Sequence, residues 1–594
     1  MFLISVNMKA LMNNEQEFDH ILIQSEKVEK LYYNKSLISS DFHECLKKYR
    51  DIHVVIHYPI SAFGAIVDLI IKIDSIIHKK MKIGIIFYSF PTPIPEIAFS
   101  NEISYHIIDP STKVITRDAF YGRSLKQISI PSSIISIEKN AFKECKLLKQ
   151  LTFEDHSSLI SIGENAFFDC KLLEQIVVPD TVTFIGDGAF GGCQSLKQMK
   201  IPSKVEVIGP QMFYRCLSLT NLTFSSSVTK IGSYAFFDCN SLTEITIPNK
   251  ITAIEEYSFN SCSSLKQFTI APSVKSVGKY AFYGCSLLTE MKIPSSVSSI
   301  GECVFYGCSS LEQIIFESIP SFSSIGSYCF YNCSSLSCIT IPSSVNIIDK
   351  CAFSNCSSLT QISFEKSEIK EINECTFSGC SSLKQITIPP YVKSIGPNAF
   401  YGCSSLEQVS ISSPLKSIGE GSFQNCSSLQ QIEIPYSLSS IGMKAFEGCS
   451  ELQQIEIPST VSSIEKNTFY GCSSLKEVLL DNYSSLIKKI GLHAFYGCSS
   501  LTRFAIPNRT VEIGTYAFYG CTSLTKVSIP RSVVEIGSFA FMGCSSLKQI
   551  IIPRTVTQIG LNAFAECSSL SNISVPSSFN KNYIGLAGKS QNFD

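Results

Sequence analysis

A phenylalanine returns at a nearly fixed interval along most of this 594-residue chain. The heptad FYGCSSL that begins at Phe400 occurs four times unchanged, and near copies extend the series from Phe120 to Phe564. There are 20 copies, and 14 of the 19 intervals between them are 23 residues long. Cys403, between a glycine and two serines, would in isolation resemble a nucleophile, but a residue repeated at a fixed period is a structural element. The repeat predicts a solenoid, in which added length adds coils rather than separate domains.

A single repeat has the pattern of a short strand followed by turns. In the coil that begins at Leu383, apolar and polar residues alternate up to Ile388, which predicts a strand with one buried face. Pro389 cannot donate to a sheet ladder, so it ends the strand. Val392 and Ile395 form a second inward-facing pair. Because no coil can bury these side chains alone, about 20 coils are expected to stack, with their strands in a concave parallel sheet.

The repeated pattern IPSSVxxIGxxAFYGCSSLxxI resembles the type-5 leucine-rich repeat of the BspA-like surface antigens, and the resemblance runs from about Tyr105 to Pro576. It implies a leucine-rich repeat solenoid that is not an enzyme. It also implies adhesion to host proteins or cells, with a host cell-surface or matrix protein as the partner. We expect such a protein to be monomeric.

The composition argues against several other functions. The 49 basic and 50 acidic residues balance, so no electrostatic footprint for nucleic acid is expected. The most apolar run, 65–77, is interrupted by charges, and the apolar run 2–6 is too short for a signal peptide, so neither membrane insertion nor a leader is expected. GLAGKS, from Gly585, lacks the spacing of a phosphate loop, and we expect no cofactor and no metal site.

The sequence divides into three parts. Residues 1–104 carry no repeat and are predicted to form a small α/β cap, with helices over 17–33, 37–49 and 65–77 and strands over 53–58 and 82–88. Residues 105–576 form the solenoid, and 577–594 form a polar tail. A cap is expected because an open solenoid end would expose its core.

Nineteen of the 25 cysteines stand three residues after the repeat phenylalanine, from Cys145 to Cys567. They are interpreted as buried free thiols that pack as small apolar groups, with disulfides and a reactive or metal-binding role as alternatives. Cys303 and Cys329 are assigned to one repeat position that is normally alanine. So many thiols persist most easily in a reducing compartment, which favours an alternative function as an intracellular scaffold for cytosolic protein partners.

Strand residues that point outward form columns, and one column is mostly glutamine. Such a column either keeps the sheet soluble or offers hydrogen bonds to an extended ligand. The ordinary pattern is interrupted where glutamates give way to Arg503 and Lys526, and this charge step is the preferred candidate for partner contact. The proposed ligand-binding residues are Gln385, Gln408, Gln431, Glu433, Gln454, Glu456, Glu477, Arg503 and Lys526.

Two further surfaces are candidates for recognition. Several longer coils carry their extra residues just after the strand, near Glu154, Glu317, Glu365 and Asp481, so these loops would share one rim. Surface loops also accept extra residues at little cost in stability, and this explains the longer coils equally well. Tyrosines such as the one at position 283 follow the repeat phenylalanine at nine positions and form either a recognition stripe or half-buried packing.

Overall fold

A computed structural model describes residues 112–317, 321–480 and 484–588, together with six strands among the first 108 residues. Those six strands are β1 (Phe2–Asn7), β2 (Ile21–Ser25), β3 (Leu31–Tyr33), β4 (Ile52–His57), β5 (Ile85–Phe87) and β6 (Tyr105–Ile108). The chain forms two compact units, Met1–Val274 and Lys275–Asp594.

The amino-terminal strands differ in part from the sequence prediction. The helix predicted over 17–33 is wrong where β2 and β3 lie, because β2 pairs antiparallel with β1 and β3 pairs antiparallel with β2. The apolar run Ile21–Ile23 pairs with the preceding and the following strand, and such pairing overrides local helical preference. Strands β4 and β5 fall where strands were predicted, whereas the helices predicted over 37–49 and 65–77 lie outside the described residues.

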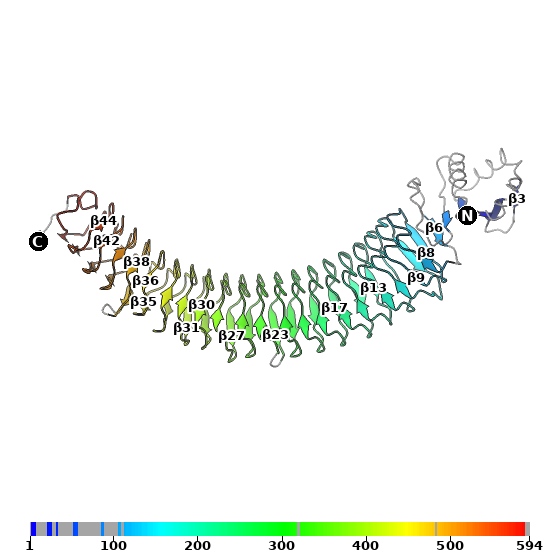
Figure 1. The fold of residues 1–594 in the computed structure, drawn as a ribbon, viewed down its shortest axis with the longest axis horizontal. Coiled ribbons are helices and arrows are strands. Elements are labelled where there is room, and N and C mark those ends of the chain that lie inside the picture. The colour runs from blue at the N-terminus through cyan, green and yellow to red at the C-terminus, as the bar shows by residue number, and fades with distance from the viewer. Residues whose placement is uncertain are drawn as a thin grey trace. The chain divides into compact units, whose positions relative to one another are not determined.

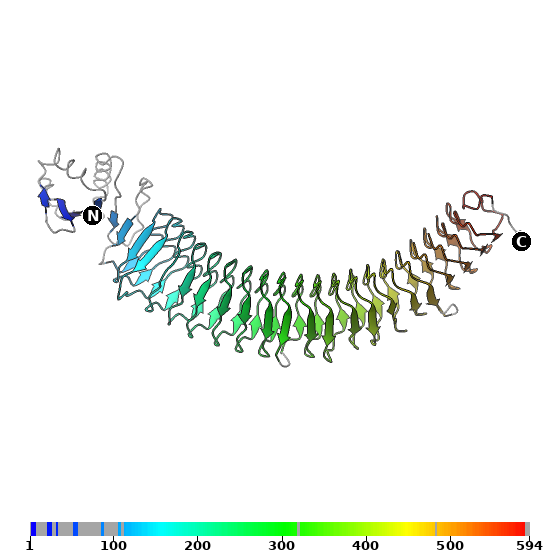
Figure 2. The same ribbon diagram turned by 180° about the vertical axis from the view of Figure 1, so that it is seen from behind.

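Both units are built from coils of one kind. A coil typically contributes a strand to a main sheet, then a two-residue strand to a narrow sheet, and then a series of turns; in one coil of unit 1, Gln175 makes isolated bridges in place of a main-sheet strand. Both sheets are parallel, and successive coils pair at equivalent repeat positions, as in Gln385↔Gln408. Figures 1 and 2 show the strands of successive coils side by side within each unit. This arrangement confirms the solenoid with a parallel main sheet that the repeat predicts.

In unit 1 the main sheet also includes β5 and β6, so it begins within the range that the sequence assigns to the cap. The later main-sheet strands of unit 1 are β8 (Gln127–Ile130), β10 (Gln150–Phe153), β13 (Gln198–Lys200), β15 (Asn221–Thr223), β17 (Glu244–Thr246) and β19 (Gln267–Thr269). Its narrow-sheet strands are β7 (Val114–Ile115), β9 (Ser136–Ile137), β11 (Ser161–Ile162), β12 (Phe184–Ile185), β14 (Val207–Ile208), β16 (Lys230–Ile231) and β18 (Ala253–Ile254).

Unit 2 repeats the arrangement with more strands. Its main-sheet strands are β21 (Glu290–Ile293), β23 (Gln313–Phe316), β25 (Cys338–Ile341), β27 (Gln361–Phe364), β29 (Gln385–Ile388), β31 (Gln408–Ile411), β33 (Gln431–Ile432), β35 (Gln454–Ile457), β37 (Glu477–Leu480), β39 (Arg503–Ala505), β41 (Lys526–Ser528), β43 (Gln549–Ile551) and β45 (Asn572–Ser574). Its narrow-sheet strands are β20 (Ser276–Val277), β22 (Ser299–Ile300), β24 (Ser324–Ile325), β26 (Ile347–Ile348), β28 (Glu371–Ile372), β30 (Ser394–Ile395), β32 (Ser417–Ile418), β34 (Ser440–Ile441), β36 (Ser463–Ile464), β38 (Lys489–Ile490), β40 (Glu512–Ile513), β42 (Glu535–Ile536) and β44 (Gln558–Ile559).

The repeat heptad forms the turns that close each coil. The Phe400 N–H donates to the carbonyl of Ser422 in the next coil at 2.8 Å, while the Cys403 N–H closes a turn onto the Phe400 carbonyl at 3.2 Å. Asn398 and Gly402 have φ angles of 52° and 70°, in the left-handed region that asparagine and glycine tolerate best. The heptad is therefore structural, as its periodicity predicts.

Phenylalanine rings and thiols fill the interior between the sheets. The fully buried Phe400 ring stacks on Phe377 at 5.5 Å and on Phe423 at 5.2 Å between ring centroids. The Cys403 thiol donates to the Phe377 carbonyl at 3.2 Å. Repeated from coil to coil, these contacts build the core ladder of each unit.

Of the 24 described cysteines, 22 are buried free thiols, which confirms that most of them pack as small apolar groups. Burial raises the pKa of the Cys356 thiol to about 12. The prediction that Cys303 and Cys329 occupy the same repeat position is wrong. Cys329 directly precedes its phenylalanine and is fully buried, whereas Cys303 stands one residue earlier, at a φ of 54°.

Candidate functional site

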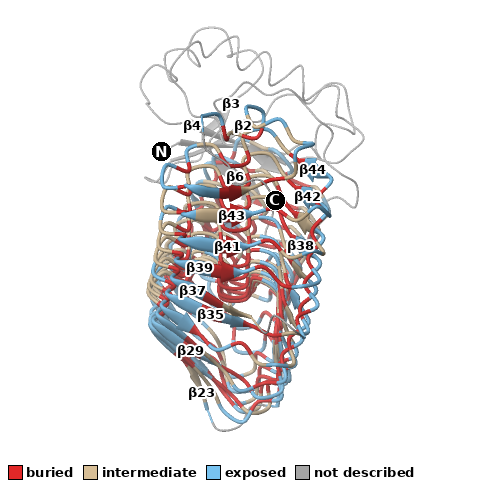
Figure 3. Cartoon of the chain, turned by 90° about the vertical axis from the view of Figure 1, so that its left-hand side faces the viewer, coloured by how far each residue is buried: buried red, intermediate tan, exposed pale blue. Residues whose placement is uncertain are grey.

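The nine predicted binding residues lie on one exposed face, the outer surface of the main sheet in unit 2. They alternate along each strand with buried neighbours, as Gln454 and Glu456 do with Ile455 and Ile457 in β35. Figure 3 shows this alternation of exposed and buried residues along the main-sheet strands. The strand register predicted from the period-two pattern is confirmed, because every one of the nine side chains is exposed to solvent.

The register places opposite charges on neighbouring strands. Glu477 of β37 is paired with Arg503 of β39, and Arg503 is paired with Lys526 of β41. Neighbouring strands of a sheet lie about 4.8 Å apart, so the sign of the surface charge changes within one strand spacing. In the part of the chain that the structure describes, none of these three side chains has an ion-pair partner.

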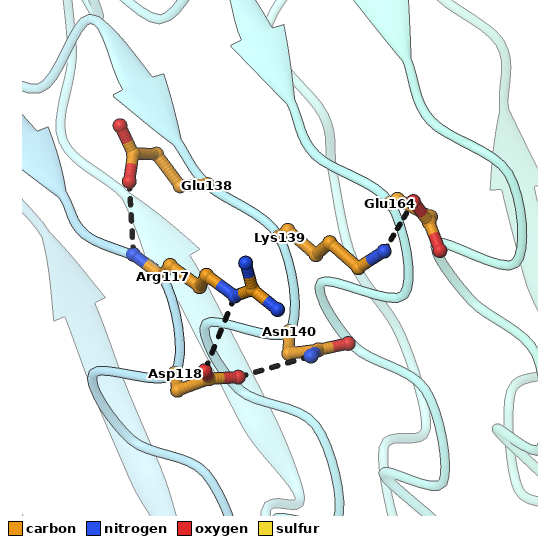
Figure 4. Close-up of polar contacts among 6 residues, drawn as sticks. All are labelled: Arg117, Asp118, Glu138, Lys139, Asn140 and Glu164. Carbon is orange, nitrogen blue, oxygen red and sulfur yellow. Dashed lines mark hydrogen bonds and ion pairs between the residues drawn. The ribbon is translucent and has the colours of Figure 1, made fainter.

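This lack of pairing is not general on the protein surface. In the first coils of unit 1, charged and polar side chains join neighbouring coils (Figure 4). Lys139 Nζ lies 2.7 Å from Glu164 Oε2, and Asn140 Nδ2 donates to Asp118 Oδ1 at 2.9 Å. At the charge step in unit 2, by contrast, the charged side chains form no ion pair with described residues of the solenoid and are available to a partner.

A groove lies next to the charge step, where the main sheet is interrupted. Strands β29, β31 and β33 form one ladder, and a second ladder starts at β35. The groove has a volume of about 660 Å³ and is lined by Gln431, Glu433, Gln454 and Glu456 among other residues. Tyr436, which is 76% exposed, stands at its margin. The structure thus gathers four of the nine predicted residues around one hollow.

The other predicted residues are distributed along the same face. Gln385 and Gln408 lie on β29 and β31, outside the lining of the groove. Glu477, Arg503 and Lys526 continue the face from the other ladder. The candidate residues form a strip rather than a closed pocket, which suits an extended ligand better than a small molecule.

The sequence prediction missed four basic residues beside this strip. Arg509, Arg531 and Arg554 follow the strand-ending prolines of three successive coils, and Lys548 directly precedes β43. All four are exposed. For the three arginines the clue was present in the sequence, since most other coils have serine or another uncharged residue after the strand-ending proline, whereas lysine is common at the position of Lys548.

Ring stacking explains much of the tyrosine stripe, although Tyr121 and Tyr401 are exposed. Tyr306 stacks on Tyr283 at 4.7 Å and on Tyr331 at 4.6 Å between ring centroids, and all three are half-buried. Because both faces of the Tyr306 ring contact another ring, little of that ring face remains for a ligand. Of the rim positions, Glu154, Glu317 and Glu365 are exposed, and Asp481 lies outside the described residues.

Two other kinds of site have no support in the described ranges. Within 112–317, 321–480 and 484–588, no group of three or more histidine, cysteine or acidic side chains is placed to hold a metal ion. The same residues include no helix with the length and apolar character needed to span a bilayer.

Three bacterial proteins are among the solved structures that the chain matches. A leucine-rich repeat protein from Bacteroides ovatus ATCC 8483 shares 26% identity, with 74% of this chain and 88% of that chain covered and a TM-score of 0.44. A leucine rich cell surface protein from Faecalibacterium prausnitzii shares 25% identity (66% and 87% covered, TM-score 0.27). The pneumococcal vaccine antigen PcpA shares 21% identity (57% and 84% covered, TM-score 0.37).

No curated protein matches the chain. The family model described as "BspA type Leucine rich repeat region (6 copies)" matches residues 113–243, 160–289, 275–407, 393–489 and 488–585. These matches extend over most of the chain and coincide with the coils of both units. The chain therefore belongs to the BspA type leucine-rich repeat family.

Proposed function

We propose that this protein is a non-enzymatic recognition solenoid that binds a protein partner through the exposed main-sheet face of unit 2. The observation that supports this proposal is the row of charges from Glu433 to Lys526 on the main-sheet face, which have no ion-pair partner among the described residues and lie beside a groove on an otherwise amide-rich sheet. A long regular face of this kind presents side chains from many coils at once, and repeat solenoids use such surfaces for extended ligands. The family resemblance makes adhesion to host proteins or cells the setting of this binding.

Charge reversal at the step tests the proposal. We expect the double variant Arg503→Glu/Lys526→Glu to bind cultured host cells and immobilised matrix proteins at least about tenfold more weakly, because like charges would then face the partner's acidic groups. Both side chains point to solvent, so the melting temperature should stay close to that of the unaltered protein, as for most surface substitutions.

A matched control is available on the other sheet. Lys393 and Lys416 are also exposed, have no ion-pair partner among the described residues, and directly precede narrow-sheet strands β30 and β32. Lys393→Glu/Lys416→Glu makes the same change in net charge and should leave adhesion unchanged. Equal loss of adhesion in both variants would show a general charge effect and would refute the main-sheet face as the binding surface.

A further inference from the structure

The charge step is the edge of a larger basic patch. Six exposed basic residues occupy the main-sheet face and the adjoining rim of three successive coils: Arg503, Arg509, Lys526, Arg531, Lys548 and Arg554. No aspartate or glutamate occurs among residues 502–509, 525–532 and 548–555, which make up this face. Within the described part of the chain none of the six has an ion-pair partner.

The three preceding coils have the opposite character. On their main-sheet face, residues 430–436, 453–459 and 476–480 carry Glu433, Glu456 and Glu477, with Lys476 as the single basic residue. Glu433 and Glu456 line the groove. This acidic zone meets the basic patch directly, because Glu477 and Arg503 are register partners.

A uniform polyanion fits this surface poorly. The basic patch extends over three coils, or about 10 Å along the solenoid at roughly 4.8 Å per coil. A longer sulfated polysaccharide or nucleic acid lying along the sheet would then pass over three glutamates. Single-stranded nucleic acid binding also uses aromatic stacking platforms, whereas Phe504, the aromatic residue of β39, is 3% exposed.

A polypeptide segment with separated charges fits both zones. We infer that the partner presents an extended segment with a cluster of acidic side chains at one end and a cluster of basic side chains at the other. Its acidic side chains contact the basic patch, where four of the six cations are arginines, whose planar guanidinium groups bind carboxylates in a bidentate manner. Its basic side chains contact Glu433, Glu456 and the groove between them.

The spacing of the two zones sets the spacing within the ligand. Glu456 and Lys526 lie three coils apart, or about 14 Å at the sheet spacing. An extended chain advances about 3.3 Å per residue, so basic and acidic side chains about four residues apart would reach both zones. This inference rests on the proposed function, since it names the chemistry of the partner for the same face.

Synthetic peptides test the inference directly. The probes are a segregated peptide of four lysines, two uncharged residues and four glutamates, and a peptide of the same composition with alternating lysine and glutamate. We expect the full-length protein to bind the segregated peptide about tenfold more tightly than the alternating one in fluorescence anisotropy at low salt. Equal affinity for the two peptides would overturn the inference.

Variants in each zone separate the two contacts. We expect about tenfold lower affinity for the segregated peptide in each of two double variants, Arg531→Glu/Arg554→Glu and Glu433→Lys/Glu456→Lys. The control Lys393→Glu/Lys416→Glu should change this affinity less than about twofold. A sulfated polysaccharide serves as a third probe. If it binds through Arg531 and Arg554 more tightly than the segregated peptide does, the patch is a polyanion site and the inference is wrong.

The outcomes also distinguish the inference from the proposed function. One outcome is that the charge-reversed protein loses adhesion to cells while the unaltered protein binds both peptides equally. This outcome would support the recognition face but would refute a partner with segregated charges. Unchanged adhesion by the charge-reversed protein would reject the recognition face itself. The melting temperature of every variant is measured, so a loss of folding is not mistaken for a loss of binding.

Discussion

Replacing Phe400 by alanine should destabilise the solenoid locally and strongly. The ring is fully buried and stacks on Phe377 and Phe423, with interplanar angles of 16° and 3°. Buried phenylalanine-to-alanine changes cost about 3–5 kcal/mol, and each stacked aromatic pair contributes about 0.5–1.5 kcal/mol beyond its buried area. The backbone bonds of Phe400 to Ser422 and from the Cys426 thiol do not involve the ring, so the loss is one of packing.

Hydrogen exchange followed by mass spectrometry measures where this loss acts. In a stack in which coils contact their neighbours, protection should fall in the coils that contain Phe377, Phe400 and Phe423 and stay unchanged in coils far along the chain. Tyr401→Ala is the matched control: it removes an adjacent aromatic ring that is 39% exposed, and it should cost about 0.5 kcal/mol. Uniform loss of protection from one end of the solenoid to the other would refute nearest-neighbour stability.

Three further predictions follow from the core. In the folded protein a thiol reagent should modify Cys338 first, because this cysteine is exposed. Most other thiols are buried and should react only after denaturation, and rapid reaction of the majority would contradict their burial. Gly419→Ala should cost more than Gly402→Ala in denaturant titrations, since a Cβ at 419 would lie 2.7 Å from the Pro397 nitrogen. At 402 no heavy atom beyond the chain neighbours lies within 4 Å of a Cβ, and the cost is that of the backbone φ of 70° alone. Stability should fall as pH rises above about 9, because burial raises the pKa of thiols such as Cys356 to about 12 while unfolded thiols ionise near 8.5. The neutral thiol is favoured in the fold, so this contribution is complete below the unfolded pKa and declines by about 1.4 kcal/mol per pH unit for each thiol above it; equal urea midpoints at pH 8 and pH 10 would contradict it.

The inward half of each coil could be predicted because burial imposes periodicity on the sequence. Leu383, Ile386 and Ile388 are apolar in alternation because the strand buries one face, and the structure places all three in the core. The same reasoning identified the thiol column, since a small side chain three residues after each phenylalanine must enter the same interior. Positions that are repeated because they are buried therefore predict the fold well.

The outward half could be predicted only in part. Arg503 and Lys526 were found because they break a column of amides, and the structure confirms that they are exposed. The groove beside Glu433 lies at the interruption between β33 and β35, and no residue type in the repeat marks where a ladder ends. The rim arginines escaped notice because they lie after the strand, beyond the period-two pattern that sets the columns. The mistaken helix over 17–33 shows a related limit, because its strands form through pairing between neighbouring segments of the chain, which a local apolar pattern does not reveal.

In this solenoid the buried positions determine the fold, and the exposed positions are proposed to specify the partner. An extra coil should therefore leave the protein folded but weaken the binding of its partner. Residues 384–406 form one 23-residue coil that ends at the leucine equivalent to Leu501, so a copy inserted after Leu501 keeps the repeat in phase. This insertion places a neutral strand between Glu477 and Arg503 and separates the acidic and basic zones by a further 4.8 Å or so. The melting temperature should stay close to that of the unaltered protein, because the added coil contributes its own packing and one more interface between coils. The segregated peptide with two uncharged residues should bind about tenfold more weakly, and a peptide with one or two additional uncharged residues should recover the lost affinity, because an extended chain advances about 3.3 Å per residue. Unchanged affinity for the original peptide would show that the two zones are not bound by one segment.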